Sequence, residues 1–113
     1  MWRLRATGGE QQASLSFRLR AGHIKTVGRA PRADFIVDAP LVSRLHCRLS
    51  VAEDGTVHVE DLGSTNGTWI NGEQITTAIL RDGHLLRVGR VEFVLERQAT
   101  GDGRPATGGN ESR

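Results

Sequence analysis

Residues 46–60, HCRLSVAEDGTVHVE, decide the fold class of this chain. Apolar and polar residues alternate on both sides of Asp54-Gly55, and such alternation is typical of a strand with one buried face. Asp-Gly between two such runs is a strong hairpin signal, because glycine readily takes the left-handed backbone of a tight turn. The stretch therefore predicts two antiparallel strands, 46–51 and 57–60, joined by a short turn.

Seven further short strands are expected on either side of this hairpin, each bounded by turn residues. They cover 2–6, 15–19, 24–27, 35–37, 68–70, 85–88 and 91–96. Only 74–80 has a pattern that could be helical, and Thr76-Thr77 argues against a helix because β-branched residues favour strands. An all-β chain with strands at this spacing indicates an antiparallel sandwich or barrel.

The chain divides into one domain and one tail. Its 113 residues, of which 37% are hydrophobic and 25% charged, suffice for one domain with a core. We expect residues 1–97 to form this domain. Residues 98–113, QATGDGRPATGGNESR, contain no large apolar side chain, so we expect a disordered tail or a linker there.

The single cysteine, Cys47, restricts both compartment and chemistry. A disulfide within the chain and a cysteine-based zinc cage are excluded. No run approaches the roughly 18 apolar residues of a membrane span, and residues 1–10 lack the apolar stretch of a secretory signal. We therefore expect an intracellular protein without membrane association.

Positive charge is concentrated at the start of the chain, although the net charge is only +2. Residues 1–32 hold seven basic side chains and one acidic one. Arg3 and Arg5, like Arg18 and Arg20, are spaced by two, which favours a position on the solvent faces of two strands. A nucleic-acid binder is the alternative, but two tryptophans, three phenylalanines and no tyrosine offer no interleaved stacking platform. No specific nucleic-acid partner is expected.

Signatures of catalysis and of metal binding are missing. The sequence has no Gly-rich loop before Lys-Ser/Thr, no dinucleotide motif, no nucleophile elbow and no His-Glu-x-x-His. The histidines, on separate expected elements, are His23, His46, His58 and His84. Ser43, His46 and Asp61 could be written as a triad, but a serine three residues before a histidine at a strand start does not face it. We expect neither an enzyme nor a metal or cofactor site.

Three loop segments remain, and each follows a strand and carries groups that can hold an anion. They are 26–29 (TVGR), 42–46 (VSRLH) and 61–72 (DLGSTNGTWING). Taken singly, they are a surface arginine, a turn serine and hairpin turns. Together they supply a guanidinium, hydroxyls, a carboxamide and backbone N–H groups, which is the set that neutralises and desolvates a phosphate dianion.

The order of these segments resembles the forkhead-associated (FHA) domain. The resemblance is carried by Gly28-Arg29, Ser43-Arg44-Leu45-His46, Ser64-Thr65-Asn66-Gly67-Thr68 and Asn71-Gly72, with 30–37 and 82–89 also fitting. It covers about residues 2–97. It implies a two-sheet antiparallel β-sandwich of about eleven strands that binds phosphothreonine peptides through loops at one end.

Matching positions imply the site residues. The binding residues would be Arg29, Ser43, Arg44, Thr65 and Asn66, and the residues that hold the loops Gly28, His46 and Gly67. Arg29 and Ser43 would hold the phosphate, with further contacts from Arg44 and Thr65, while Asn66 would fix the peptide backbone. His46 would be a neutral core histidine, and Trp69 and Ile70 are also expected in the core.

One position departs from some relatives, which carry an arginine two residues before the phosphate-binding serine. That arginine recognises an acidic side chain three residues beyond the phosphothreonine. Here the position is Leu41. The resemblance therefore implies an apolar preference at that place in the ligand, unless Arg90 supplies the positive charge.

The resemblance implies a monomeric adaptor that binds phosphothreonine-containing proteins in Ser/Thr-kinase signalling. The alternative is a structural or dimerisation module that keeps the fold without phosphate binding. Its usual sign is loss of the arginine or the serine, and this chain retains both Arg29 and Ser43.

Overall fold

The computed structural model describes residues 1–7 and 15–98, and within these ranges the chain forms eleven strands and no helix. The strands are β1 (Trp2–Ala6), β2 (Ser16–Leu19), β3 (Ile24–Gly28), β4 (Phe35–Ile36), β5 (Cys47–Val51), β6 (Val57–Asp61), β7 (Thr68–Ile70), β8 (Glu73–Ile75), β9 (Thr77–Leu80), β10 (Leu85–Val88) and β11 (Val91–Arg97). No described segment is a helix long and apolar enough to cross a membrane. The expected tail, 98–113, lies outside the described residues except for Gln98.

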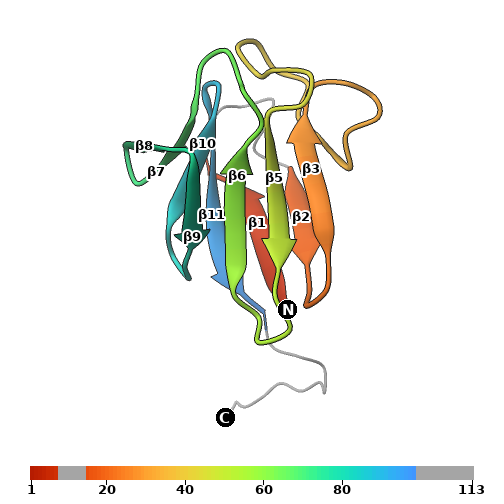
Figure 1. Ribbon diagram of the computed structural model, residues 1–113, viewed down its shortest axis with the longest axis vertical. Helices are drawn as coiled ribbons and strands as arrows, with labels where there is room; N and C mark the ends of the chain where they lie inside the picture. Colours follow the sequence, from red (N-terminus) through yellow and green to blue (C-terminus); the bar gives the residue numbers. More distant parts are fainter. Residues whose placement is uncertain (8–14, 99–113) are drawn as a thin grey trace.

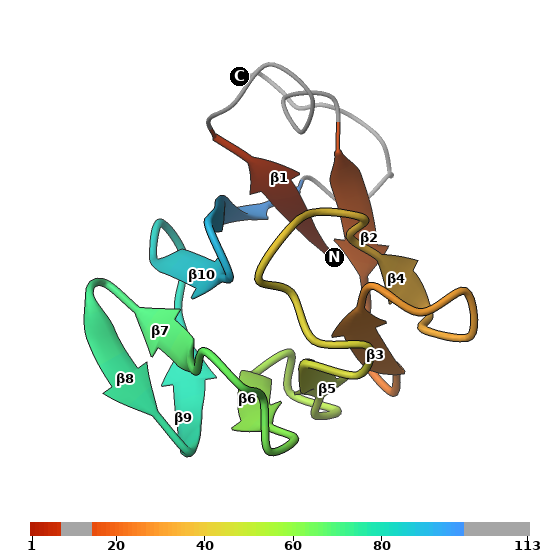
Figure 2. The same cartoon turned by 90° about the horizontal axis from the view of Figure 1, so that it is seen from above.

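The strands form two sheets that pack face to face (Figures 1 and 2). One sheet has six strands in the order β2-β1-β11-β10-β7-β8, and the other has five in the order β4-β3-β5-β6-β9. The strand pairs are antiparallel apart from β3 and β4, which pair in parallel over two residues. The expected all-β sandwich is confirmed, and the barrel that periodicity left open is not formed.

Strand alternation produces the core between the sheets. In β1, Trp2, Leu4 and Ala6 are buried, whereas Arg3 and Arg5 lie on the outer surface, where both form ion pairs with Glu96. The same alternation in β11 buries Val91, Phe93 and Leu95. Burial of one such large apolar side chain stabilises the fold by about 1.5–3 kcal/mol. The solvent-face interpretation of the N-terminal arginine pairs is confirmed for Arg3 and Arg5.

The nine strands expected from the sequence all form, with ends that shift by at most one residue. The expected hairpin turn at Asp54-Gly55 also forms: Gly55 has a φ of 90°, and the Asp54 carboxylate accepts the N–H of Thr56. Residues 74–80 are not helical. They belong to β8 and β9, which end and begin on either side of Thr76.

One core expectation is wrong. Ile70 is buried, but Trp69 is only half-buried and lies on the outer face of its sheet. Because side chains alternate along a strand, burial of both Thr68 and Ile70 places Trp69 on the opposite face. There the guanidinium carbon of Arg87 lies 4.9 Å from its ring centroid, a cation–π arrangement.

The loops between the strands gather at two ends of the sandwich. Figure 1 shows the β3–β4, β4–β5, β6–β7 and β10–β11 connections together at the top, with the β5–β6 turn at the bottom. We call the first group, residues 29–34, 37–46, 62–67 and 89–90, the loop end. Figure 2 views the molecule onto this end. Each of the three anion-competent segments of the sequence therefore contributes residues to this end.

Candidate functional site

His46 joins three segments of the loop end. Its side chain is fully buried, its Nδ1 accepts the N–H of Ser43 at 3.0 Å, and its Nε2 lies 2.8 Å from the carbonyl oxygen of Gly67. An amide N–H only donates and a carbonyl only accepts, so these partners require the neutral imidazole with its proton on Nε2. The His46 backbone also bonds to Val27 and Leu62, at 2.8 and 3.0 Å. One buried residue thus fixes the mutual position of three chain segments.

Two backbone bonds connect the end of β3 with the β4–β5 loop. The N–H of Arg29 donates to the carbonyl of Ser43 at 3.0 Å, and the N–H of Ala30 donates to that of Arg44 at 3.1 Å. Gly28 permits this approach, because a Cβ at this position would lie 2.0 Å from the carbonyl oxygen of Arg44. The absence of a side chain at Gly28 therefore brings Arg29 and Ser43 side by side.

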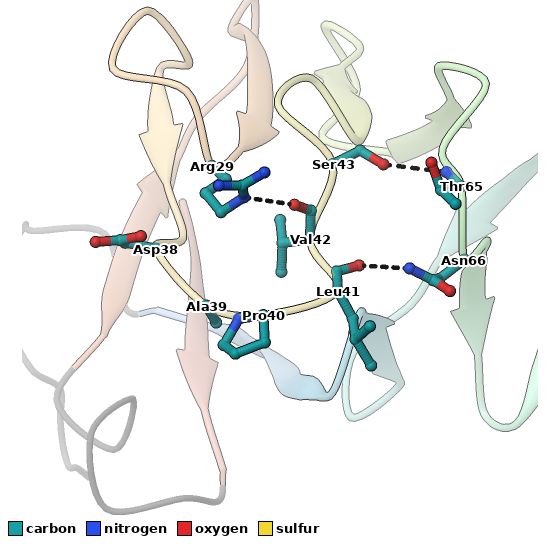
Figure 3. A pocket seen from close by; sticks show the side chains of 9 residues that line it. All are labelled: Arg29, Asp38, Ala39, Pro40, Leu41, Val42, Ser43, Thr65 and Asn66. Carbon is teal, nitrogen blue, oxygen red and sulfur yellow. Dashed lines mark hydrogen bonds between the residues drawn. The ribbon is translucent and has the colours of Figure 1, made fainter.

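The Arg29 side chain is exposed and only partly used. Its Nε donates to the carbonyl of Val42 at 3.0 Å (Figure 3). A guanidinium has five N–H donors, so this bond fixes the side chain and leaves the terminal donors for another acceptor. Within the described parts of the chain, Arg29 forms no ion pair. A fixed arginine without a carboxylate partner is suited to bind an external anion.

Two hydrogen bonds cross from the β4–β5 loop to the β6–β7 loop (Figure 3). The N–H of Thr65 donates to the Ser43 hydroxyl at 3.0 Å, and Nδ2 of Asn66 donates to the carbonyl of Leu41 at 3.1 Å. The Ser43 hydroxyl keeps its own proton to donate, and the Asn66 carboxamide keeps its oxygen and its second N–H. Both side chains thus retain donors or acceptors for a ligand.

Asp61 orders the β6–β7 loop from its first residue. Its carboxylate accepts the N–H groups of Gly63 and Ser64, at 3.0 and 3.1 Å, and the hydroxyls of Ser64 and Thr68. Partial burial acts to raise the pKa of the Asp61 carboxyl, but these donors outweigh it and hold the pKa below its ordinary value. The Ser64 hydroxyl in turn accepts the N–H of Gly67 at 3.0 Å. This network presents the two residues between Ser64 and Gly67 to solvent.

The sequence analysis did not predict that Asp61 orders the β6–β7 loop. The available signal was an aspartate two residues before Gly63, since aspartate side chains commonly accept backbone N–H groups two residues on. Gly67 is restricted as well: its φ is +86°, and a Cβ there would lie 2.5 Å from Nε2 of Gln74.

Leu41 has an unusual backbone conformation at this end of the molecule. Its φ is 71°, in the left-handed region that branched side chains rarely adopt, and its side chain is 45% exposed. The β10–β11 turn packs closely against it, because a Cβ on Gly89 would lie 2.9 Å from the Leu41 carbonyl carbon. The Gly89-Arg90 turn and the Leu41 segment therefore border the same part of the loop end.

These segments enclose an open hollow of about 560 Å³. It is lined by Arg29, Asp38, Ala39, Pro40, Leu41, Val42, Ser43, Thr65 and Asn66 (Figure 3). Four of the five binding residues expected from the sequence line it together. The fifth, Arg44, instead lines a neighbouring hollow, together with Ala30, Pro31, Arg32 and Leu45.

Fold and loop end together define a β-sandwich recognition domain. The family model of the FHA domain matches residues 25–89, and the chain belongs to the FHA domain family. The family resemblance stated from the sequence is confirmed.

Known proteins are similar to this chain both in sequence and in structure. The glycogen accumulation regulator GarA of Mycobacterium tuberculosis is 35% identical over 89 residues, which cover 76% of this chain and 53% of GarA. This chain therefore spans about half the length of the curated relative. The FHA domain of CT664 from Chlamydia trachomatis superposes with a TM-score of 0.79 at 29% identity, covering 87% of this chain and 98% of that one.

A further relative was solved in a structural and functional analysis of phosphothreonine-dependent FHA domain interactions. It superposes with a TM-score of 0.77 at 27% identity, covering 88% of this chain and 98% of the other.

Proposed function

We propose that this chain is a phosphothreonine-binding module that acts as an intracellular adaptor in Ser/Thr-kinase signalling. The observation that carries the proposal is the pairing of Arg29 with Ser43: a fixed, exposed guanidinium beside a hydroxyl on one open hollow. Membership of the FHA family supports this proposal. So does the similarity to the relative that was solved in a study of phosphothreonine-dependent FHA domain interactions. The proposed partner is a phosphothreonine-containing protein, and the proposed working state is a monomer.

The proposed roles follow from the hydrogen-bond donors and acceptors that each side chain does not use within the domain. A phosphothreonine brings about −1.5 to −2 charges and three acceptor oxygens. Arg29 donates its terminal N–H groups to these oxygens, and Ser43 donates its hydroxyl proton. Each charge-assisted bond contributes about 1.5–3 kcal/mol. Thr65 adds a polar contact, Asn66 binds the ligand backbone through its carboxamide, and Arg44 acts from the neighbouring hollow.

Selectivity for threonine over serine would rest on one methyl group in a small apolar recess. Such a group is worth roughly 1–3 kcal/mol, so phosphoserine should bind more weakly but measurably. A glutamate in place of the phosphothreonine offers one charge and two oxygens, so it should not substitute for the phosphate.

A fold that serves only structure or dimerisation is the competing function. Its expected sign, a lost arginine or serine, is absent: Arg29 and Ser43 are both in the chain and both line the hollow. Phosphate recognition is therefore the better supported proposal.

The experiment is a titration with a degenerate phosphothreonine peptide library, paired with the same library carrying threonine. We expect selective retention of phosphopeptides, with the best sequences binding at low-micromolar strength, roughly −8 kcal/mol. Arg29→Ala serves as the control that should retain neither library. Equal retention of both libraries by the unchanged chain would contradict the proposal.

A further inference from the structure

A second hollow lies beside the first at the loop end, with a volume of about 710 Å³. Two of its five lining residues are arginines, and they come from different loops: Arg32 from the β3–β4 loop and Arg44 from the β4–β5 loop. Of the residues that the structure describes, no acidic side chain lines this hollow. Its remaining lining residues are Ala30, Pro31 and Leu45.

Both arginines are exposed, and in the described ranges neither forms an ion pair. This separates them from Arg3, Arg5 and Arg48, each of which has a glutamate partner. Two like charges facing one recess repel each other unless an anion lies between them. The apolar wall strengthens any such ion pair, because it excludes part of the screening water.

The backbone beneath the two arginines is fixed. The N–H of Ala33 closes a turn on the carbonyl of Ala30 at 3.0 Å, and Ala33 is buried while Arg32 stays exposed. The N–H of Ala30 also bonds to the carbonyl of Arg44. The distance between the two arginine backbones is therefore set by the fold before any ligand binds.

The two hollows are neighbours along the same pair of segments. Arg29 and Ser43, joined by one backbone bond, line the first hollow. Ala30 and Arg44, joined by the next, line the second. Because the two bonded pairs are consecutive along both segments, a ligand that lies across these segments at the first hollow also reaches the second.

We propose that the hollow between Arg32 and Arg44 binds a second anionic group of the same ligand, a carboxylate or a phosphate on a residue close to the phosphothreonine. The preferred ligand class is then a phosphothreonine peptide with an acidic or second phosphorylated residue at one defined spacing. This inference rests on the proposed function, because the first phosphate aligns the ligand.

Calorimetry on a set of phosphothreonine peptides tests the proposal. Glutamate is placed in turn at each of the four positions on either side of the phosphothreonine, and each peptide is paired with its glutamine counterpart. We expect glutamate at one or two positions on one side to tighten binding about three- to tenfold, as two exposed ion pairs would. A third arm with phosphoserine at those positions distinguishes the two sources of charge: the larger charge of a phosphate should give the larger gain.

The glutamate-to-glutamine affinity ratio is then measured for variants. Arg32→Ala/Arg44→Ala should reduce the ratio to about one, and Arg32→Ala alone should reduce it with little change for the glutamine peptide. The matched control Arg20→Ala/Arg81→Ala removes the same charge from exposed arginines outside both hollows and should leave the ratio unchanged. Thermal melts verify that each variant is folded.

Three outcomes would overturn the proposal. A ratio near one at every position, with phosphothreonine binding intact, would refute the second site alone. An equal decrease of the ratio in the control variant would show that net charge, not this hollow, produces the gain. Absence of any phosphothreonine-dependent binding would refute the proposed function and this inference with it.

Discussion

Two residues of the loop end illustrate how recognition and folding are divided among side chains. Arg29 is exposed, and among the described residues its side chain bonds only to the carbonyl of Val42. His46 is fully buried and bonds through both ring nitrogens to Ser43 and Gly67. Substituting the first should therefore affect binding, and substituting the second should affect stability.

Arg29→Ala should abolish phosphothreonine binding, weakening it at least a hundredfold, because the strongest charge-assisted donors to the phosphate are lost. The free energy of unfolding should change by about 0.5 kcal/mol or less, as is usual for an exposed side chain. Calorimetry and a thermal melt on the same sample check both halves. A variant that melts far below the unchanged chain would contradict the assignment of Arg29 to recognition.

His46→Ala should lower the free energy of unfolding by about 2–4 kcal/mol, because it opens a cavity and leaves the N–H of Ser43 and the carbonyl of Gly67 without partners. For a domain of this size the melting temperature should fall by roughly 10–20 °C. The control is His58→Ala, since His58 is exposed on β6. Similar melting temperatures for the two variants would show that His46 does not hold the loops together.

At the scale of elements, the β6–β7 loop depends on one carboxylate. Donors from Gly63, Ser64 and Thr68 lower the pKa of Asp61 in the folded state. A group with a lowered folded pKa contributes its stability above its unfolded pKa, about 3.9 for aspartate, and loses it as the pH falls through the folded value. The loop should therefore be held firmly at neutral pH and loosen in acid.

Asp61→Asn should lower stability at pH 7 by about 1 kcal/mol, because a neutral amide accepts fewer and weaker hydrogen bonds. The difference from the unchanged chain should shrink below about pH 4 and disappear once the carboxyl is protonated in both states. Thermal melts from pH 2.5 to 7 measure this. A difference that persists unchanged into acid would show that the charge of Asp61 is not what orders the loop.

Most elements could be predicted from the sequence, because alternation and turn residues act locally. The hairpin around Asp54-Gly55 is the clearest case. β8 and β9 were not predicted. The residues of β8 are exposed or half-buried and two of them are Glu and Gln, which are depleted in strands, while β9 fully buries only Leu80. The residues alone predicted loops able to hold an anion, whereas the roles of the individual side chains could be predicted only through resemblance. Contacts such as Ala30 with Arg44 join loops by tertiary backbone bonds, which local patterns do not encode.

At the scale of the whole molecule, the basic first third of the chain does not form one track. Arg3 and Arg5 lie on the outer face of the six-stranded sheet, where Glu96 partly neutralises them. Arg29 and Arg32 lie at the loop end, on two different hollows. A dispersed charge of this kind is suited to weak, salt-sensitive attraction rather than to sequence recognition.

Duplex DNA should accordingly bind weakly, with an affinity that falls steeply as salt is raised. Replacing Arg3, Arg5, Arg18 and Arg20 by alanine should leave phosphopeptide affinity unchanged, because none of them lines either hollow. Fluorescence anisotropy with two unrelated duplexes at several salt concentrations measures the DNA side. Sub-micromolar, sequence-selective binding at physiological salt would refute this prediction.

Phosphothreonine recognition by the loop end is tested most directly by calorimetry with one library-selected peptide, titrated in its phosphothreonine form and in its threonine form. We expect low-micromolar binding of the phosphothreonine form, roughly −8 kcal/mol, and no measurable heat with the threonine form. The phosphoserine form should bind more weakly by about 1–3 kcal/mol. Equal affinity for the phosphothreonine and threonine forms would contradict recognition of a phosphorylated threonine by this loop end. Absence of binding by both forms would contradict it as well.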